Sequence, residues 1–68
     1  MFKVTIPKLA FNKLVGRILI GETTDWTLAH TMSQASADWL QERIDMVDPE
    51  DNLIRSYYPN DRVEINNA

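Results

Sequence analysis

The absence of cysteine is the feature that most restricts how this chain can fold, because it excludes both disulfide bonds and thiolate metal sites. At 68 residues the hydrophobic core must be small, since about 60% of the unfolded surface is buried at this size. Hydrophobic residues make up 44% of the chain, which favours folding over disorder. We therefore expect one small domain over residues 1–68, and a homodimer would hide further apolar surface.

Charged residues are segregated along the chain. Residues 1–17 carry a local charge of +4 with no acid, and residues 18–54 carry −7 with Arg43 as their one base. The basic residues of the first block are Lys3, Lys8, Lys13 and Arg17. The acidic residues of the second block are Glu22, Asp25, Asp38, Glu42, Asp45, Asp48, Glu50 and Asp51. Such an asymmetry favours electrostatic contact with a partner of opposite charge.

Two strands are expected before the first helix. Phe2–Ile6 alternates apolar and polar side chains with period two, which indicates a strand that ends at Pro7. Residues 17–20 are rich in β-branched and aliphatic side chains, which indicates a second strand that ends at Gly21. The segment 8–15 fits neither period, so helix, turn and strand all stay open there.

The best-defined element is an amphipathic helix from Trp26 to about Val47. Thr24 or Asp25 is suited to cap its first amides, and Pro49 disfavours helical geometry beyond its end. The side chains expected on its buried face are Leu28, Ala29, Met32, Ala35, Trp39, Leu40, Ile44, Met46 and Val47. The helix therefore presents one apolar face to a sheet and one polar face to solvent.

Several residues qualify this helix. Ser33 and Ser36 leave its continuity open, because serine is a mediocre helix former. Arg43 falls within the apolar face, where it must snorkel, pair with an acid or lie beyond the core. His30 lies one turn after Trp26, and we interpret it as a boundary histidine resting on the indole rather than as a general base or pH switch.

The C-terminal third of the chain is expected to form strands. Asp48–Asn52 has the composition of a turn, and Leu53–Tyr58 is predicted as a third strand. A turn at 58–62 and a short fourth strand at Val63–Ile65 would complete a hairpin. The order β-β-α-β-β predicts an α+β fold, with one long amphipathic helix on a sheet of three or four mainly antiparallel strands whose order stays open.

Sequence motifs of catalysis and cofactor binding are lacking. The chain has one histidine, and Asp48–Asn52 lacks the glycine and the distant glutamate of a calcium loop. Gly16 and Gly21 lack the context of a phosphate-binding loop. We expect no enzymatic activity, no metal and no cofactor.

The apolar runs are too short for a targeting or membrane segment. Basic residues interrupt the first twenty positions, and runs such as Ile18–Ile20 are far below the roughly 20 residues that a membrane helix needs. We therefore expect a cytoplasmic protein without membrane contact.

The sequence favours a protein that acts by binding, as an adaptor or inhibitor of a larger protein with a basic surface. In general character it is like small effectors encoded by phages and mobile elements. An acidic helix face can steer such a partner, and tyrosine is enriched at binding hot spots. Tyr57 and Tyr58 should point to opposite sides of a strand, so one is expected in the core and the other exposed. The candidate contact residues are Asp38, Glu42, Asp45, Glu22, Asp25, Tyr57 and Tyr58.

Two alternative functions stay open. A small structural or assembly subunit would self-associate, with the basic segment of one copy against the acidic helix of another. A nucleic-acid binder would use Lys3, Lys8, Lys13 and Arg17, although the net charge of −3 makes nucleic acid an unfavoured partner.

Overall fold

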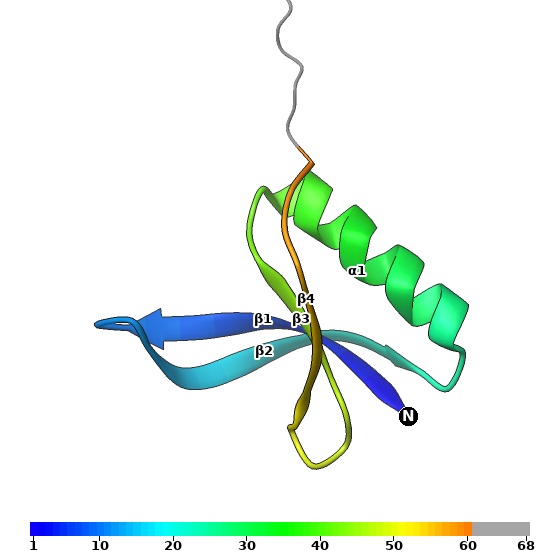
Figure 1. The fold of residues 1–68 in the computed structure, drawn as a ribbon, viewed down its shortest axis with the longest axis horizontal. Coiled ribbons are helices and arrows are strands. Elements are labelled where there is room, and N and C mark those ends of the chain that lie inside the picture. Colours follow the sequence, from blue (N-terminus) through cyan, green and yellow to red (C-terminus); the bar gives the residue numbers. More distant parts are fainter. Residues whose placement is uncertain (61–68) are drawn as a thin grey trace, which may run out of the picture.

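The computed structural model describes residues 1–60, which form one helix and four strands (Figure 1). In chain order these are β1 (Phe2–Ala10), β2 (Lys13–Thr23), α1 (Trp26–Leu40), β3 (Ile44–Val47) and β4 (Leu53–Tyr57). The strands form one antiparallel sheet in the order β2-β1-β3-β4, and α1 packs on one face of it. The predicted α+β fold with the order β-β-α-β-β is confirmed.

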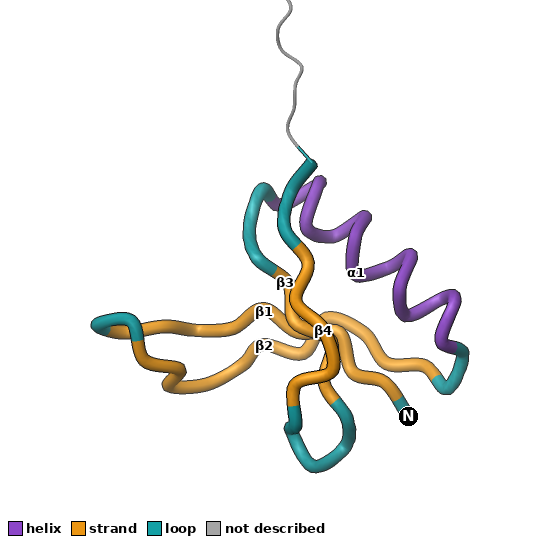
Figure 2. Tube along the Cα trace, in the orientation of Figure 1, coloured by secondary structure: helices purple, strands orange, loops and turns teal. Residues whose placement is uncertain are grey.

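The strands β1 and β2 form a long hairpin whose end projects away from α1 (Figure 2). The segment 8–15 is therefore the end of a hairpin, in which Phe11 and Asn12 turn the chain with φ angles of 54° and 65°. Positive φ at both central residues gives a turn whose twist matches that of paired strands. The predicted strand end at Pro7 is wrong. β3 pairs with Lys3–Thr5, so β1 beyond that segment is paired on one side and tolerates proline.

The helix α1 has defined caps at both ends. Asp25 is the N-cap, and its carboxylate accepts hydrogen bonds from the Thr27 and Leu28 amides at 2.9 and 3.3 Å. Gln41 closes the helix in a left-handed conformation, with φ at 56°. The helix is continuous through Ser33, whose Oγ donates to the Ala29 carbonyl at 2.7 Å. Within residues 1–60, no helix has the length and apolar character that crossing a bilayer requires.

The predicted extension of the helix to Val47 is wrong, because Ile44–Val47 forms the strand β3. β3 lies in the middle of the sheet between β1 and β4, and all four of its residues are buried. A short apolar run suits a central strand as well as a helix, so periodicity alone does not separate the two. The strand expected at Leu53–Tyr58 is β4, while the strand expected at 63–65 and part of the turn at 58–62 lie outside the described residues.

The core lies between α1 and the sheet. Its buried apolar side chains are Val4, Ala29, Ala37, Ile44, Met46 and Tyr57, and Phe2, Ile6 and Met32 pack against them. The helix contributes the small residues Ala29, Ser33 and Ala37, so its backbone lies close to the sheet. Gly21 of β2 belongs to this close packing, because a Cβ atom there would overlap the Met32 side chain.

The predicted buried face of the helix is therefore largely wrong. Leu28, Ala35 and Trp39 lie on the exposed side of α1, and the exposed fraction of Trp39 is 87%. Large side chains from the strands, such as Ile44 and Met46, fill the space beneath the helix. Alanine and serine therefore occupy the closest helix positions, and Leu28, Trp39 and Leu40 turn outward while Met32 packs at the edge of the core.

We predict that Ala37→Leu lowers the free energy of unfolding by about 1–3 kcal/mol, because it overfills the contact between α1 and the sheet. Ala35→Leu is the matched control, and its exposed position should keep the change below about 0.5 kcal/mol. Urea titrations followed by circular dichroism measure both values. A larger loss in Ala35→Leu than in Ala37→Leu would contradict this helix orientation.

Candidate partner-binding surface

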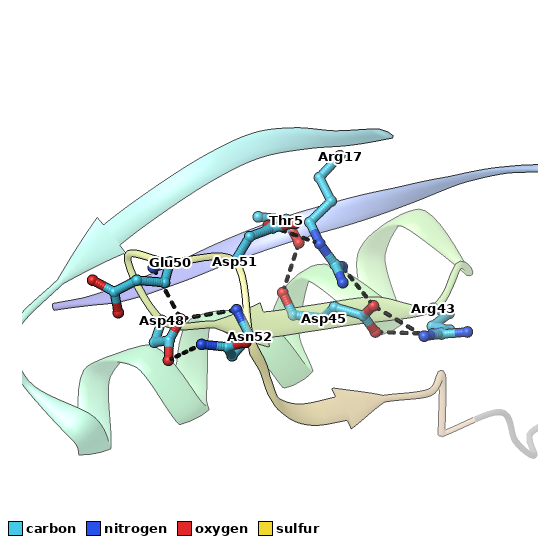
Figure 3. Close-up of polar contacts among 8 residues, drawn as sticks. All are labelled: Thr5, Arg17, Arg43, Asp45, Asp48, Glu50, Asp51 and Asn52. Carbon is cyan, nitrogen blue, oxygen red and sulfur yellow. Dashed lines mark hydrogen bonds and ion pairs between the residues drawn. The ribbon is translucent and has the colours of Figure 1, made fainter. Parts of the chain in front are cut away.

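Asp45 was predicted on the exposed side of the helix and is instead a buried residue of β3. Its neighbours in β3 face α1, so its side chain lies on the opposite face of the sheet. Figure 3 shows two guanidinium groups reaching its carboxylate: Arg17 donates from Nη1 at 2.7 Å, and Arg43 from Nε at 2.8 Å and Nη2 at 3.0 Å. Ser56 Oγ donates at 2.8 Å, and Thr5 Oγ1 donates to the Asp45 carbonyl at 2.9 Å.

The hydrogen bonds to Asp45 decide its charge state. Burial opposes ionisation of the carboxyl group, but hydrogen bonds from Arg43, Arg17 and Ser56 outweigh it and hold the pKa of Asp45 below its ordinary value of 3.8. The hydrogen bond between Arg43 and Asp45 also raises the pKa of Arg43. The carboxylate is thus neutralised inside the fold, where it joins β2, β3 and β4, and it is not available to a partner.

The turn between β3 and β4 adds a second acid to Arg17. Arg17 Nε lies 3.0 Å from Asp51 Oδ1, an ion-pair distance without the alignment of a hydrogen bond. Asp48 organises this turn, because its Oδ1 accepts from the Asn52 and Glu50 amides at 2.8 and 3.0 Å. These bonds, with that from Asn52 largest, lower the pKa of Asp48. The predicted turn at Asp48–Asn52 is confirmed, and its acids serve the fold.

The remaining acidic residues do not form one continuous face. Asp38 Oδ1 accepts hydrogen bonds from Gln34 Nε2 at 3.1 Å and from the Asn60 amide at 2.8 Å. Glu42 is exposed just beyond the end of α1, and Glu22 is exposed at the end of β2. Asp38 and Glu42 are therefore the part of the predicted acidic helix face that remains exposed near the C-terminal end of α1.

Tyr57 and Tyr58 divide between core and surface, as predicted. Tyr57 is 3% exposed, burial raises its pKa, and its hydroxyl group lies 2.9 Å from His30 Nδ1. The His30 ring stacks on Trp26 with 6.1 Å between ring centroids, so the boundary position predicted for this histidine is confirmed. Tyr58 is 60% exposed and is the tyrosine available for contact.

The basic residues of the first block are not brought together either. Arg17 is held by its ion pairs inside the fold, and Lys3 is half-buried in β1. Lys8 and Lys13 are exposed near the end of the hairpin, on either side of Phe11. Of the four basic residues that a nucleic-acid surface would have used, two lysines are thus exposed.

The apolar side of α1 is the feature that the sequence analysis missed. Its spacing was visible, but periodicity shows which side chains share a side of a helix and not whether the sheet covers them. Trp39 is the largest of these side chains, and in the chain Asp38 directly precedes it and Glu42 follows three residues later. Gln34 Nε2 also donates to the Tyr58 carbonyl at 2.8 Å, which brings β4 to this end of α1. We use the name helix-end patch for four exposed residues at or near the C-terminal ends of α1 and β4: Asp38, Trp39, Glu42 and Tyr58.

We predict that Asp45→Asn lowers the free energy of unfolding by about 3 kcal/mol at neutral pH, because Arg17 and Arg43 lose the buried counter-charge that they share. The folded-state pKa of Asp45 lies below the ordinary 3.8, so the carboxylate stabilises fully above that value. This stabilisation falls as the pH drops through the folded-state pKa. Urea titrations should therefore show the two proteins converging in acid, and a constant difference down to about pH 2 would contradict the ion-pair assignment.

Comparison with known proteins gives no relative from which a role could be transferred. No protein-family model, curated protein or solved structure matches the chain. Within residues 1–60 there is no pocket, and no group of three or more histidine or acidic side chains is placed to hold a metal ion. The functional argument therefore starts from the exposed surface of the chain itself.

Proposed function

We propose that this chain is a small non-catalytic binding protein, an adaptor or inhibitor, that occupies a surface of a larger protein through the helix-end patch. The exposure of Trp39 carries the proposal. An indole that is 87% exposed on an ordered helix adds nothing to the core and is costly to leave in water. Tryptophan is also the residue type most enriched among binding hot spots, where it fills a pocket of the partner.

The surroundings of Trp39 indicate the chemistry of that partner. Asp38 and Glu42 lie close to it in the chain, and residues 18–42 contain no lysine or arginine. Asp38 is fixed in place by its two hydrogen bonds, so its charge is preorganised at the residue that precedes Trp39 in the helix. A complementary surface has an apolar pocket with a basic rim, which speeds the encounter and selects the partner.

The proposal narrows the acidic helix face to two residues. Asp45 is committed to Arg17 and Arg43, so Asp38 and Glu42 supply the charge, and the exposed Tyr58 ring adds contact area. A cytoplasmic location is part of the proposal, because a fold without disulfides suits a reducing compartment.

The test is affinity capture from cell extract with the wild-type chain and two matched variants. Trp39→Ser should keep its thermal stability, because the side chain is exposed, and should bind the captured protein about 30-fold more weakly, as hot-spot truncations do. Leu53→Ser removes another large exposed side chain outside the helix-end patch and should leave the affinity unchanged. Titration calorimetry with the purified captured protein gives both affinities.

Two outcomes would overturn the proposal. One is a captured protein that binds Trp39→Ser and the wild-type chain equally well. The other is equal loss of affinity in Trp39→Ser and Leu53→Ser, which would mean that the contact lies elsewhere.

A further inference from the structure

The strand β2 forms one edge of the sheet and is the longest strand, with 11 residues. One side of it pairs with β1, and no other strand within residues 1–60 pairs with its outer side (Figure 1). Such an edge presents a row of backbone N–H and C=O groups that can pair with another strand.

The edge of β2 lacks exposed charge and proline between Leu14 and Gly21, and its two register shifts against β1 leave Gly16–Leu19 regular. Natural edge strands are short or carry exposed charges and proline. Between Leu14 and Gly21 the one charged residue is Arg17, which is turned to Asp45. Exposed apolar side chains, with exposed fractions of 38–65%, are Leu14, Val15, Ile18, Leu19 and Ile20.

The opposite edge of the sheet is shorter and carries a charge, although Leu53 and Ile54 are exposed there as well. β4 has five residues, carries the exposed charge of Arg55 and is followed closely by Pro59. Within residues 1–60, the β4 edge is therefore short and charged, and the β2 edge is long, apolar and unpaired.

The charges at the two ends of β2 favour a second copy of this chain as the occupant. The strand starts at Lys13, with Lys8 nearby on β1, and ends at Thr23, with Glu22 just before this residue and Asp25 two residues beyond it. Antiparallel pairing with a second β2 brings the basic start of each strand to the acidic end of the other. This happens twice in a closed two-fold dimer, whereas parallel pairing would bring like charges together.

Symmetry restricts the register of this pairing. A two-fold axis perpendicular to the sheet sets one residue opposite its own copy. Gly16–Leu19 pairs regularly with β1 between the two register shifts, so the central residues are Arg17 and Ile18. Arg17 on the axis would oppose two guanidinium groups, while Ile18, 46% exposed, opposes two apolar side chains.

We propose that β2 pairs antiparallel with β2 of a second copy about Ile18, which joins two sheets into one of eight strands. The contact uses a surface other than the helix-end patch, so it goes beyond the proposed function and does not rest on it. It covers the exposed side chains of β2 and satisfies the open edge.

Cysteine substitution tests the register, because the native chain has no cysteine. In Ile18→Cys the two cysteines would lie opposite each other with Cα atoms about 5 Å apart, within disulfide range. Mild oxidation should convert this variant to a covalent dimer. Val15→Cys is the control, since its two copies would be roughly 20 Å apart. Val15 is more exposed than Ile18, so random collision would favour the control.

Sedimentation velocity over a range of concentrations tests the dimer itself. Ile18→Lys should raise the dimer dissociation constant by more than about tenfold, because it opposes two ammonium groups. Ile54→Lys, on the opposite edge of the sheet, should leave that constant unchanged, and circular dichroism checks that both variants are folded.

A wild-type chain that stays monomeric overturns the dimer, as does equal oxidation of Ile18→Cys and Val15→Cys. Neither result bears on Trp39, and loss of capture by Trp39→Ser does not bear on the dimer. A monomer that pairs with a strand of another protein would appear as a heteromeric complex sensitive to Ile18→Lys, and would likewise overturn the second copy as occupant.

Discussion

The buried carboxylate of Asp45 is the interaction on which the rest of this structure depends. It lies in the central strand β3 and is neutralised by Arg17 from β2 and Arg43 beside β3. A buried charge without its partners would be strongly destabilising, so the three residues must come together as the sheet forms. Residues of the basic and acidic blocks of the sequence thus pair with each other within one molecule, where Arg17 also contacts Asp51. This internal pairing removes the most central charges from any binding surface.

The consequence for function follows from how the core is filled. The strands supply its large side chains, and α1 approaches through Ala29, Ser33 and Ala37. Leu28, Leu40 and above all Trp39 are left outside, and within residues 1–60 the outer edge of β2 is unpaired. In a domain of this size the core alone gives marginal stability. The apolar surface that the chain does not bury itself can be covered by a partner.

The sequence predicted local features correctly where residues close together in the chain determine the structure. The Asp25 cap, the Asp48–Asn52 turn and the division between Tyr57 and Tyr58 each depend on a few adjacent residues. The fate of Ile44–Val47 did not follow, because pairing with β1 and β4 decides it over long range. The exposed side of α1 was missed for the same reason: a helix wheel groups side chains but does not say which group the sheet covers. A bulky residue such as Phe11 seldom adopts a positive φ, so the sequence did not indicate a tight hairpin turn there.

Trp39 is exposed to solvent in the free protein, and we propose that it binds a partner there. Acrylamide quenching of tryptophan fluorescence measures this most directly, in a Trp26→Phe variant whose emission comes from Trp39 alone. We expect quenching close to that of free indole in the isolated chain, with shielding that appears when the captured protein is added. A Trp39 already shielded in the isolated chain would mean that the helix packs its apolar side inward, and would contradict the account.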